Sequence, residues 1–361
     1  MKVLIFSLAY LPFIGGAEVA IKEITDRIGD IEFDLLTVNL DGKQKNQERI
    51  GNINVYRLGK NKLAKYFFPW TAYEKAKELN QEKKYDAIWA MMANQAGLAT
   101  LFFKWKFPAV KYLLTLQEGD SNRSIWLRTW FMRPLYKAIY RQADYIQAIS
   151  NFLAQRAKQL GVKCPVEVVP NGIILPADQV SSQKIGSYVI SVSRLTKKNG
   201  LEDLVKAMQF VPGKQLKLVG DGELKEKLKK LTANLGLQDR VEFVGQVDYR
   251  LVYDYLRNAS VFVRPSLSEG LGNAFLEAMA VNTPVIATPV GGIPDFLIDG
   301  QTGWFCKVRN PESIAKKINY ILDPQNANEV NRVVEDAYQM VRQKYRWDLI
   351  ASQMKEIFSH L

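Results

Sequence analysis

The sequence predicts an α/β protein built from two doubly wound, parallel-sheet domains. Three observations predict this class: the length of 361 residues, the regular alternation of strand-like and helix-like segments, and the restart of that alternation after a polar break near residue 172. A chain of this length exceeds what one hydrophobic core usually spans, so we expect two domains of about 150–180 residues. The alternation indicates parallel sheets with helices on both faces.

The first domain is predicted over residues 1–172. Ser150 predicts the N-cap of a helix that ends before Gly161. Apolar residues at helical spacing occur at 17–28, 72–79 and 125–141. Apolar and β-branched runs, typical of strands covered on both faces, occur at 2–10, 33–39, 55–58, 86–91, 111–116 and 145–149.

The second domain is predicted over residues 173–345. The sequence Pro170-Asn171-Gly172 precedes a polar stretch that we interpret as the interdomain linker, with Pro176, Asp178, Ser181 and Ser182. Strands are then expected at 188–193, 216–219, 241–244, 261–264 and 285–287, and helices at 201–209, 223–234, 249–257 and 272–280. Residues 347–358 predict an amphipathic helix within a last segment, about 346–361, that could pack back on the first domain.

Composition excludes several classes of protein. With 47% hydrophobic and 24% charged residues, the chain has the average composition of a globular protein rather than a disordered one. Cys164 and Cys306 lie far apart with no metal-binding spacing, and His360 is the single histidine. We therefore expect no disulfide scaffold, no zinc cluster and no catalytic triad that needs histidine.

The net charge of +12, with a pI near 9.4, predicts attraction to an anionic partner: nucleic acid, a phospholipid surface or a phosphorylated substrate. The N-terminus is interpreted as a first strand rather than a signal peptide. The uncharged stretch 87–103 is interrupted by Asn94, Gln95, Gly97 and Thr100, so we interpret it as a buried strand and a helix, not a membrane span. We expect a soluble, cytoplasmic protein.

The segment 268–279 is the most informative motif. It follows a predicted strand, and Gly270 and Gly272 allow a tight turn in front of a helix whose free N–H groups suit a diphosphate. Glu269 lies before this helix and Glu277 lies inside it, where two carboxylates could accept hydrogen bonds from the hydroxyls of a sugar and of a ribose. The alternative is a plain helix N-terminus with one capping acid and one solvated acid.

Two other strand-to-helix turns carry candidate phosphate ligands. Arg194 follows the first strand of the second domain, where its guanidinium could hold phosphate oxygens and Lys198 could add a charge. The alternative is a solvated basic loop. In the first domain, Gly15 and Gly16 permit close approach of the backbone to a ligand, but they lack the spacing of a dinucleotide site, so a structural turn is the alternative.

Taken in order, these motifs resemble family 4 of the retaining glycosyltransferases. The resemblance spans nearly the whole chain and is strongest from about residue 189 to residue 305. Its ordered motifs are Gly15-Gly16-Ala17-Glu18, Arg194-Leu195, Val219-Gly220-Asp221-Gly222, Glu269 with Glu277, and Gly291-Gly292-Ile293-Pro294-Asp295. An ordered set of weak motifs is more specific than any one of them.

The resemblance implies the GT-B fold, in which two Rossmann-like domains face each other across a cleft. It implies no metal and no cofactor, a nucleoside-diphosphate sugar as donor bound by the second domain, and an acceptor bound by the first. Carried over residue by residue, the resemblance assigns the diphosphate to Arg194, Gly272, Asn273 and Ala274. It assigns the ribose to Glu277, the base to the backbone near Val247 and the donor sugar to Glu269. When the cleft closes, Gly15 and Gly16 are expected to lie against the phosphates.

This chain departs from the family pattern at three positions. Asn199 stands where the family usually has lysine, so we expect Lys198 to substitute as the second cationic phosphate ligand. Gln117 stands where the family often has histidine; it could bind a sugar hydroxyl but cannot supply a proton at neutral pH. Ile174 replaces a frequent aspartate in the turn after Gly172.

The resemblance implies transfer with retention at the anomeric carbon, by a front-face route in which the leaving phosphate takes the proton of the acceptor hydroxyl. Cations and amides placed at the leaving group would then provide the main catalytic effect. The expected acceptor is a sugar or a lipid-linked or cell-envelope polysaccharide. The alternatives are a sugar-nucleotide epimerase, a phosphorylase, or a nucleotide- or membrane-binding protein without activity.

Residues 104–141 form a basic, aromatic segment. The segment contains eight basic residues but only two acidic ones, Glu118 and Asp120. Trp, Tyr and Phe residues are interleaved with the basic residues. The basic residues are Lys104, Lys106, Lys111, Arg123, Arg128, Arg133, Lys137 and Arg141. This mixture suits an anionic membrane surface, which predicts a peripheral protein on the inner face of the cell membrane. An amphipathic helix with its aromatic residues in the core is the alternative. No nucleic-acid module is recognised, so we expect no nucleic-acid partner.

Overall fold

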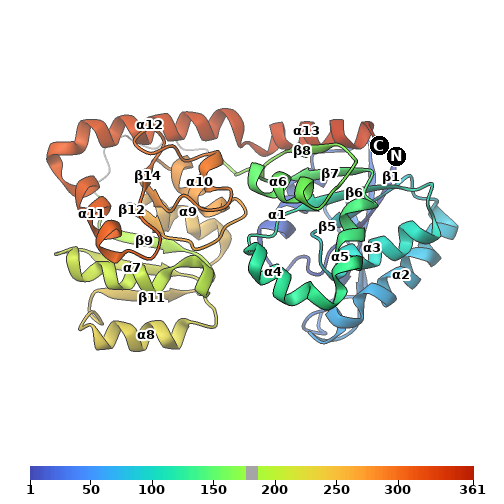
Figure 1. Ribbon diagram of the computed structural model, residues 1–361, viewed down its shortest axis with the longest axis horizontal. Helices are drawn as coiled ribbons and strands as arrows, with labels where there is room; N and C mark the ends of the chain where they lie inside the picture. Colours follow the sequence, from blue (N-terminus) through green and yellow to red (C-terminus); the bar gives the residue numbers. More distant parts are fainter. Residues whose placement is uncertain (176–185) are drawn as a thin grey trace. The chain divides into compact units, whose positions relative to one another are not determined.

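The computed structural model describes residues 1–175 and 186–361, and it leaves the side chains of residues 122 and 123 undescribed. The linker residues Pro176, Asp178, Ser181 and Ser182 therefore lie outside the described residues. The chain divides into two compact units, residues Met1–Gly172 with Trp347–Leu361 (unit 1) and residues Ile173–Arg346 (unit 2) (Figure 1).

In the described part of unit 1, eight strands form one sheet in the order β3-β4-β2-β1-β5-β6-β7-β8. All neighbouring pairs are parallel except β3 with β4, which form an antiparallel hairpin. The strands are β1 (Lys2–Phe6), β2 (Glu32–Val38), β3 (Gln47–Ile50), β4 (Ile53–Leu58), β5 (Ala87–Met91), β6 (Lys111–Leu116), β7 (Tyr145–Ala148) and β8 (Val166–Val168).

The helices of unit 1 cover this sheet. Ser150 caps α6, because its hydroxyl accepts a hydrogen bond from the Leu153 amide, as the sequence predicts. The uncharged stretch 87–103 is a buried strand followed by a helix, which confirms that interpretation. The helices are α1 (Gly16–Thr25), α2 (Ala64–Lys83), α3 (Gln95–Lys106), α4 (Asn122–Thr129), α5 (Arg133–Arg141), α6 (Asn151–Gln159) and α13 (Trp347–Ser359).

Two helices of unit 1 differ from the prediction. The helix predicted over 125–141 is divided into α4, the 3-10 turn η1 (Trp130–Met132) and α5. Pro134 explains the division, because a proline has no N–H to donate and its ring collides with the carbonyl four residues earlier. Helix α2 begins at Ala64 rather than at residue 72, with Pro69 accommodated inside it.

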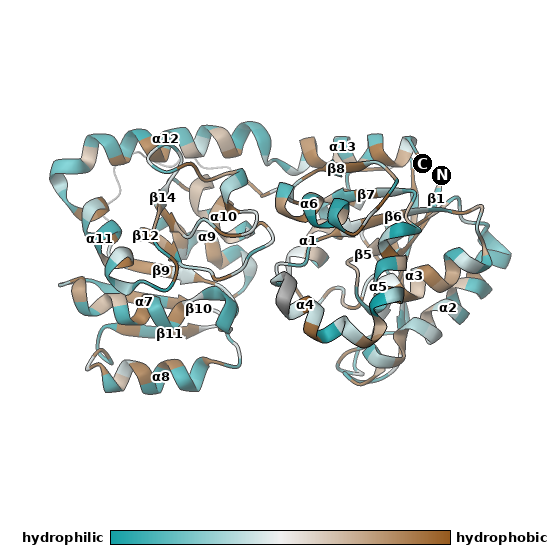
Figure 2. Ribbon diagram, viewed as in Figure 1, coloured by the Kyte–Doolittle hydropathy of each residue, from teal (hydrophilic) through white to brown (hydrophobic). Residues whose placement is uncertain are grey.

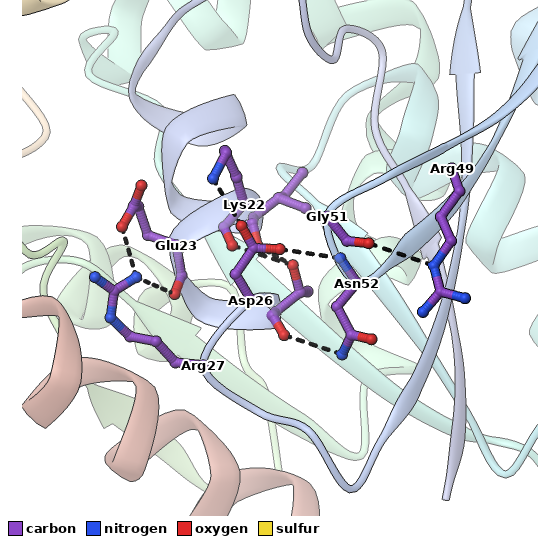
Figure 3. A network of polar contacts seen from close by, with 9 residues as sticks. Lys22, Glu23, Asp26, Arg27, Arg49, Gly51 and Asn52 are labelled. Atoms are coloured by element: carbon purple, nitrogen blue, oxygen red, sulfur yellow. Dashed lines mark hydrogen bonds and ion pairs between the residues drawn. The ribbon is translucent and has the colours of Figure 1, made fainter.

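A polar network fastens the β3–β4 hairpin to the end of α1 (Figure 3). The Asn52 side chain donates to the carbonyls of Thr25 and Ile28 at 3.2 and 3.0 Å, and the Asn52 amide donates to Asp26 at 3.0 Å. Lys22 pairs with the same aspartate at 2.7 Å. These contacts satisfy carbonyls that the end of a helix otherwise leaves without a partner.

In the described part of unit 2, six parallel strands form one sheet in the order β11-β10-β9-β12-β13-β14. The elements are β9 (Tyr188–Val192), α7 (Leu201–Ala207), β10 (Gln215–Val219), α8 (Lys225–Asn234), β11 (Val241–Gly245), α9 (Tyr249–Arg257), β12 (Ala259–Arg264), α10 (Asn273–Ala280), β13 (Val285–Ala287), β14 (Trp304–Phe305), α11 (Pro311–Leu322) and α12 (Ala327–Lys344), with short 3-10 turns between some of them. Strand β9 is largely hydrophobic, whereas α8 is largely hydrophilic (Figure 2).

The chain's last helix, α13, belongs to unit 1 although unit 2 precedes it in the sequence. Trp347, Ile350 and Phe358 are buried in the core of unit 1. The ring of Phe358 lies 5.8 Å from that of Phe33 and 5.4 Å from that of Trp89, centroid to centroid. Among the helices of the described residues, none is long and apolar enough to cross a membrane.

Candidate active site

The loops that follow the strands of unit 2 meet at the carboxyl edge of its sheet. Two glycines fit only because a side chain is absent: a Cβ at Gly200 would lie 1.9 Å from the Pro265 carbonyl oxygen, and a Cβ at Gly291 would lie 1.8 Å from that of Glu269. The Leu195 amide also donates to the Asp221 carbonyl at 2.9 Å. The loops after β9, β10, β12 and β13 therefore form one closely packed edge, the place where open α/β sheets bind ligands.

Glu269 is held at this edge by a buried ion pair. Arg264, the last residue of β12, donates from Nη2 to Glu269 Oε2 at 2.6 Å, and the two side chains are 7% and 14% exposed. The guanidinium also lies 4.2 Å from the centroid of the Phe275 ring, within cation–π range. Sequence reasoning missed Arg264. A charged residue at the end of an otherwise apolar strand was the feature that could have indicated its role.

Glu277 lies inside α10 and is buried, so the alternative of a solvated acid at this position is wrong. The Tyr249 hydroxyl donates to its Oε1 at 2.9 Å. Burial raises the pKa of Glu277 from 4.5 to about 7, against the opposing effects of the Tyr249 hydrogen bond and the Arg264 charge. Tyr249 is a second residue that sequence reasoning missed, because it lies on a different helix.

Helix α10 presents its N-terminus at the same edge. Its N-cap is Gly272, with φ +91°, and a glycine has no side chain that could accept from the amides of the first turn. Asn273 and Ala274, the first two helical residues, are half-buried. The amides of this turn can therefore donate to an anion, with the helix dipole in support.

The loop after β9 places Arg194 at the surface and Asn199 beneath it. Arg194 is exposed, whereas Asn199 is buried. The Asn199 side chain donates to the Arg194 carbonyl at 2.6 Å and to the Thr196 hydroxyl at 3.4 Å. Asn199 therefore shapes the loop that carries Arg194. Lys198 is half-buried, and its carbonyl accepts from the Leu267 amide at 2.6 Å.

Val247 is half-buried in the loop after β11, two residues beyond Gly245.

In unit 1, Gly15 is the N-cap of α1 and Gly16 is its first residue; both are exposed. The N-terminus of α1 is thus a second helix start whose cap has no side chain.

Gln117 follows β6 in unit 1 and is held by Asn171. The two carboxamides exchange hydrogen bonds, each at 3.2 Å, and Asn171 is buried. The neighbouring Glu118 accepts from the Ala93 amide through Oε1 at 2.5 Å, and its Oε2 atom is buried without a partner among the described residues. Burial raises the pKa of Glu118. Sequence reasoning counted Glu118 only as an acid of the basic segment.

The basic, aromatic segment is divided between core and surface. Tyr140 is buried, as the alternative of core-facing aromatic residues expects. Trp126, Leu127, Trp130 and Phe131 are instead exposed, at 52%, 57%, 66% and 66%. Helix α5 also carries an open groove lined by Arg133, Pro134, Lys137, Ala138, Arg141 and Gln142.

One of the eight cations has a structural role instead. Lys104 is buried, pairs with Asp144 at 2.7 Å and donates to the carbonyls of Pro108 and Val110, both at 2.9 Å. The Lys104 charge is therefore neutralised by Asp144 inside unit 1 and does not contribute to a membrane-facing surface. The side chain of Arg123 lies outside the described residues.

Comparison with known proteins places this chain in a class. A sequence model of Glycosyltransferase Family 4 matches residues 14–175, and one of Glycosyl transferases group 1 matches residues 178–340. An uncharacterised glycosyltransferase of Methanocaldococcus jannaschii is 27% identical over 365 residues, which cover all of this chain and 99% of that protein. A lipopolysaccharide core biosynthesis glycosyltransferase of Rhizobium meliloti is 33% identical over 235 residues, 59% of this chain and 68% of that protein.

The fold has solved counterparts. The crystal structure of Anabaena HepE in complex with UDP-glucose matches with a TM-score of 0.82 at 20% identity, over the whole of both chains. The two parallel-sheet units and these matches confirm the predicted fold class: the protein is a glycosyltransferase with the GT-B fold. More specifically, the chain belongs to glycosyltransferase family 4.

Proposed function

We propose that this enzyme transfers a sugar from a nucleoside-diphosphate sugar to an acceptor hydroxyl, with retention at the anomeric carbon and without a metal ion. The observation that carries the proposal is the edge of unit 2, which combines an exposed arginine, the open start of α10 and two partly enclosed carboxylates. The match to HepE, solved with UDP-glucose, supports a nucleotide-sugar donor.

Each part of this edge suits one part of the donor. Arg194, with Lys198 in support, and the first-turn amides at Asn273 and Ala274 bind the diphosphate. Glu277 accepts hydrogen bonds from the ribose hydroxyls, and the backbone near Val247 faces the base. Glu269, which Arg264 holds in place, binds the donor sugar. Asn199 orients the loop of Arg194 rather than binding phosphate itself.

The same groups suit the chemistry of transfer. When the bond from sugar to phosphate breaks, positive charge develops at the anomeric carbon and negative charge develops on the phosphate. Cations and amides already in position stabilise the leaving group, which is usually the largest catalytic contribution. The departing phosphate oxygen takes the proton from the acceptor hydroxyl, so no histidine is needed, and Gln117 orients the acceptor by hydrogen bonding alone.

Donor binding tests this proposal. We expect nucleoside diphosphates and their sugars to raise the melting temperature of the native protein. Arg194→Ala should weaken the binding of a nucleoside diphosphate by about 1.5–3 kcal/mol, the range for hydrogen bonds to charged groups, as measured by calorimetry. Lys197→Ala, an exposed cation of the same loop, is the matched control. Unchanged affinity in the Arg194 variant would remove this residue from the site.

Turnover separates an enzyme from a protein that only binds nucleotides. Donor-dependent release of nucleoside diphosphate is expected of the transferase, and a non-catalytic protein would release none. Glu269→Gln should reduce turnover but spare the affinity for free nucleoside diphosphate, which has no sugar. Glu277→Ala should weaken both ligands, since each carries the ribose. Equal effects of both substitutions on nucleoside diphosphate affinity would contradict this division of roles.

We further propose that the acceptor is lipid-linked or part of a cell-envelope polysaccharide, and that the enzyme docks on the cytoplasmic face of the membrane. The exposed aromatic residues of α4 and η1 and the cations of α5 support this proposal. Interfacial aromatic residues and Lys or Arg near anionic headgroups each favour such docking. The curated relative from Rhizobium meliloti acts in lipopolysaccharide core biosynthesis by its name.

Sedimentation with vesicles tests the docking. Arg128, Arg133 and Lys137 changed together to Glu should abolish sedimentation with anionic vesicles at low salt and leave donor binding intact, because the edge of unit 2 is unchanged. The same reversal at Lys227, Lys229 and Lys230 of α8 is the control. Wild-type protein that stays in the supernatant would favour a soluble acceptor.

A further inference from the structure

Helix α2 has two halves of different character. From Gly51 to Tyr73 the sequence contains no acid, while Lys60 and Lys62 precede the helix and Lys65 lies in its first turn. Four large apolar side chains of the N-cap and this first half are exposed: Leu63 at 65%, Tyr66 at 56%, Phe67 at 65% and Trp70 at 61%. We call these seven residues the α2 patch: Lys60, Lys62, Leu63, Lys65, Tyr66, Phe67 and Trp70.

The side of α2 opposite the patch packs in the core of unit 1. Phe68 and Ala72 are buried at 0% exposure and Pro69 is also buried, so this half of the helix already contributes side chains to the core of unit 1. The second half is an ordinary solvated surface, in which Lys75 pairs with Glu78 at 2.5 Å and Lys77 with Glu74 at 2.6 Å. The exposed apolar residues therefore gather where acids are absent.

The α2 patch continues onto α3, which packs beside α2 (Figure 1). The rings of Trp70 and Phe102 lie 6.2 Å apart, and those of Phe102 and Trp105 lie 5.9 Å apart. Trp105 is itself 52% exposed, and Lys106 follows it. Helix α3 also packs against α5, which belongs to the basic, aromatic segment. Exposed aromatic residues thus extend across neighbouring helices of unit 1.

We propose that the α2 patch, with Trp105, is a membrane-docking element whose occupant is an anionic lipid bilayer. Leu63 favours lipid over nucleic acid, because an aliphatic side chain can neither hydrogen-bond to a base nor stack on one. Tryptophan and tyrosine sit favourably at the headgroup level, and lysines place their charges among anionic headgroups while their alkyl stems cover apolar surface. The inference deepens the docking proposed above, on which it rests, by identifying which residues enter the lipid.

An environment-sensitive probe tests this insertion directly. In a Cys164→Ser background, where the remaining Cys306 is buried, Phe67→Cys is labelled with the fluorophore NBD. Glu78→Cys, on the second half of the same helix, is the matched control. With phosphatidylglycerol-containing vesicles at low salt, we expect the emission of the Phe67→Cys probe to rise and shift to shorter wavelength, and that of the control to stay unchanged.

A pair of charge reversals tests the role of the lysines. Lys60→Glu with Lys62→Glu should release the protein from anionic vesicles, while Lys75→Glu with Lys77→Glu should leave it bound. Equal release by both pairs, or no release by either, would overturn the inference.

The remaining outcomes separate this inference from the proposed function. A silent Phe67→Cys probe on vesicles that sediment wild-type protein would overturn the α2 element and leave docking by α4 and α5 in place. Wild-type protein that binds nucleoside diphosphate but no vesicles would overturn all docking and leave the transferase. The same probe response with uncharged phosphatidylcholine vesicles would overturn the assignment of an anionic surface.

Discussion

At the scale of single residues, Arg264 is the most informative finding. It brings a full charge into the interior of unit 2, where Glu269, the ring of Phe275 and the Val192 carbonyl surround it. A buried pair of this kind contributes little net stability compared with apolar residues, but removing one partner leaves the other charge buried and alone. The arrangement is therefore better explained by the positioning of Glu269 than by stability.

Arg264→Met should lower the free energy of unfolding by about 3–5 kcal/mol, since it leaves the Glu269 carboxylate without its partner in a largely buried place. Urea denaturation of the whole chain measures this loss. Arg264→Met combined with Glu269→Gln should recover part of it, because the uncompensated charge is gone. A loss below about 1 kcal/mol in the single variant, as for an exposed pair, would show that solvent already screens this ion pair.

Glu277 predicts a pH dependence of stability. Its pKa is about 7 in the folded protein against an ordinary 4.5, so the folded state binds the proton more tightly than the unfolded state. This carboxyl's contribution to stability therefore falls as the pH rises from 4.5 to 7 and is constant above that window. Glu277→Gln removes the titrating group.

The free energy of unfolding of wild type minus that of Glu277→Gln should decline across this window, measured by urea denaturation at closely spaced pH values. Glu269→Gln, another carboxylate of the same edge, is a useful comparison. A difference that rises with pH instead would mean that Tyr249 and Arg264 outweigh the burial of Glu277.

At the scale of the element, the start of α10 depends on glycine. At Gly272, with φ +91°, a Cβ would lie 2.4 Å from Arg264 Nη2 and 2.6 Å from the Phe275 ring. Gly213 also has a left-handed φ, +70°, but a Cβ there would meet nothing within 4 Å. The two positions separate backbone strain from steric collision.

Gly213→Ala should cost about 1–2 kcal/mol of stability, the strain of a left-handed residue. Gly272→Ala should cost about 1–3 kcal/mol more, since the Arg264 guanidinium or the Phe275 ring must move. It should also weaken nucleoside diphosphate binding, because Gly272 is the N-cap of the helix whose first-turn amides we propose to bind the diphosphate. Thermal denaturation and calorimetry measure these effects. An equal loss of stability at both glycines would mean that the side chains of Arg264 and Phe275 move aside from residue 272 without a measurable loss of stability.

At the scale of the whole molecule, the two units are joined twice. The chain leaves unit 1 after Gly172 and returns to it at Trp347, so α13 completes a core that begins with β1. Helix α13 contributes Phe358 to this core, where the Phe358 ring packs edge-on against both Phe33 and Trp89. The folding of unit 1 therefore depends on residues that follow the whole of unit 2 in the sequence.

Phe358→Ala should destabilise the protein by about 3–5 kcal/mol, the usual cost of removing a buried aromatic ring. Leu349→Ala on the same helix is the control, because Leu349 is 39% exposed and its loss should cost no more than about 0.5 kcal/mol. Chemical denaturation followed by circular dichroism measures both. If the two variants lose equal stability, α13 is not part of the core of unit 1.

The sequence by itself determined the α/β class, most of the strands and the family. These depend on local patterns: apolar runs of the length of a strand, helical spacing such as that of α1, and the ordered motifs around Gly15, Arg194 and Glu269. Each can be seen within a few residues of the chain, so no three-dimensional information is needed. The edge strands β3, β8 and β14 were missed. Strands β3 and β8 are short and half-exposed and β14 has only two residues, so each leaves a weak pattern.

Only the tertiary structure decided which of these residues act together. It pairs Arg264 with Glu269, Tyr249 with Glu277, and Gln117 with Asn171, which is 54 positions away in the sequence. It buries Asn199 under the loop of Arg194, uses Lys104 inside the core, and exposes the first half of α2. Such outcomes depend on which side chains meet when distant segments pack, and helical spacing cannot tell which face of a helix the core will cover.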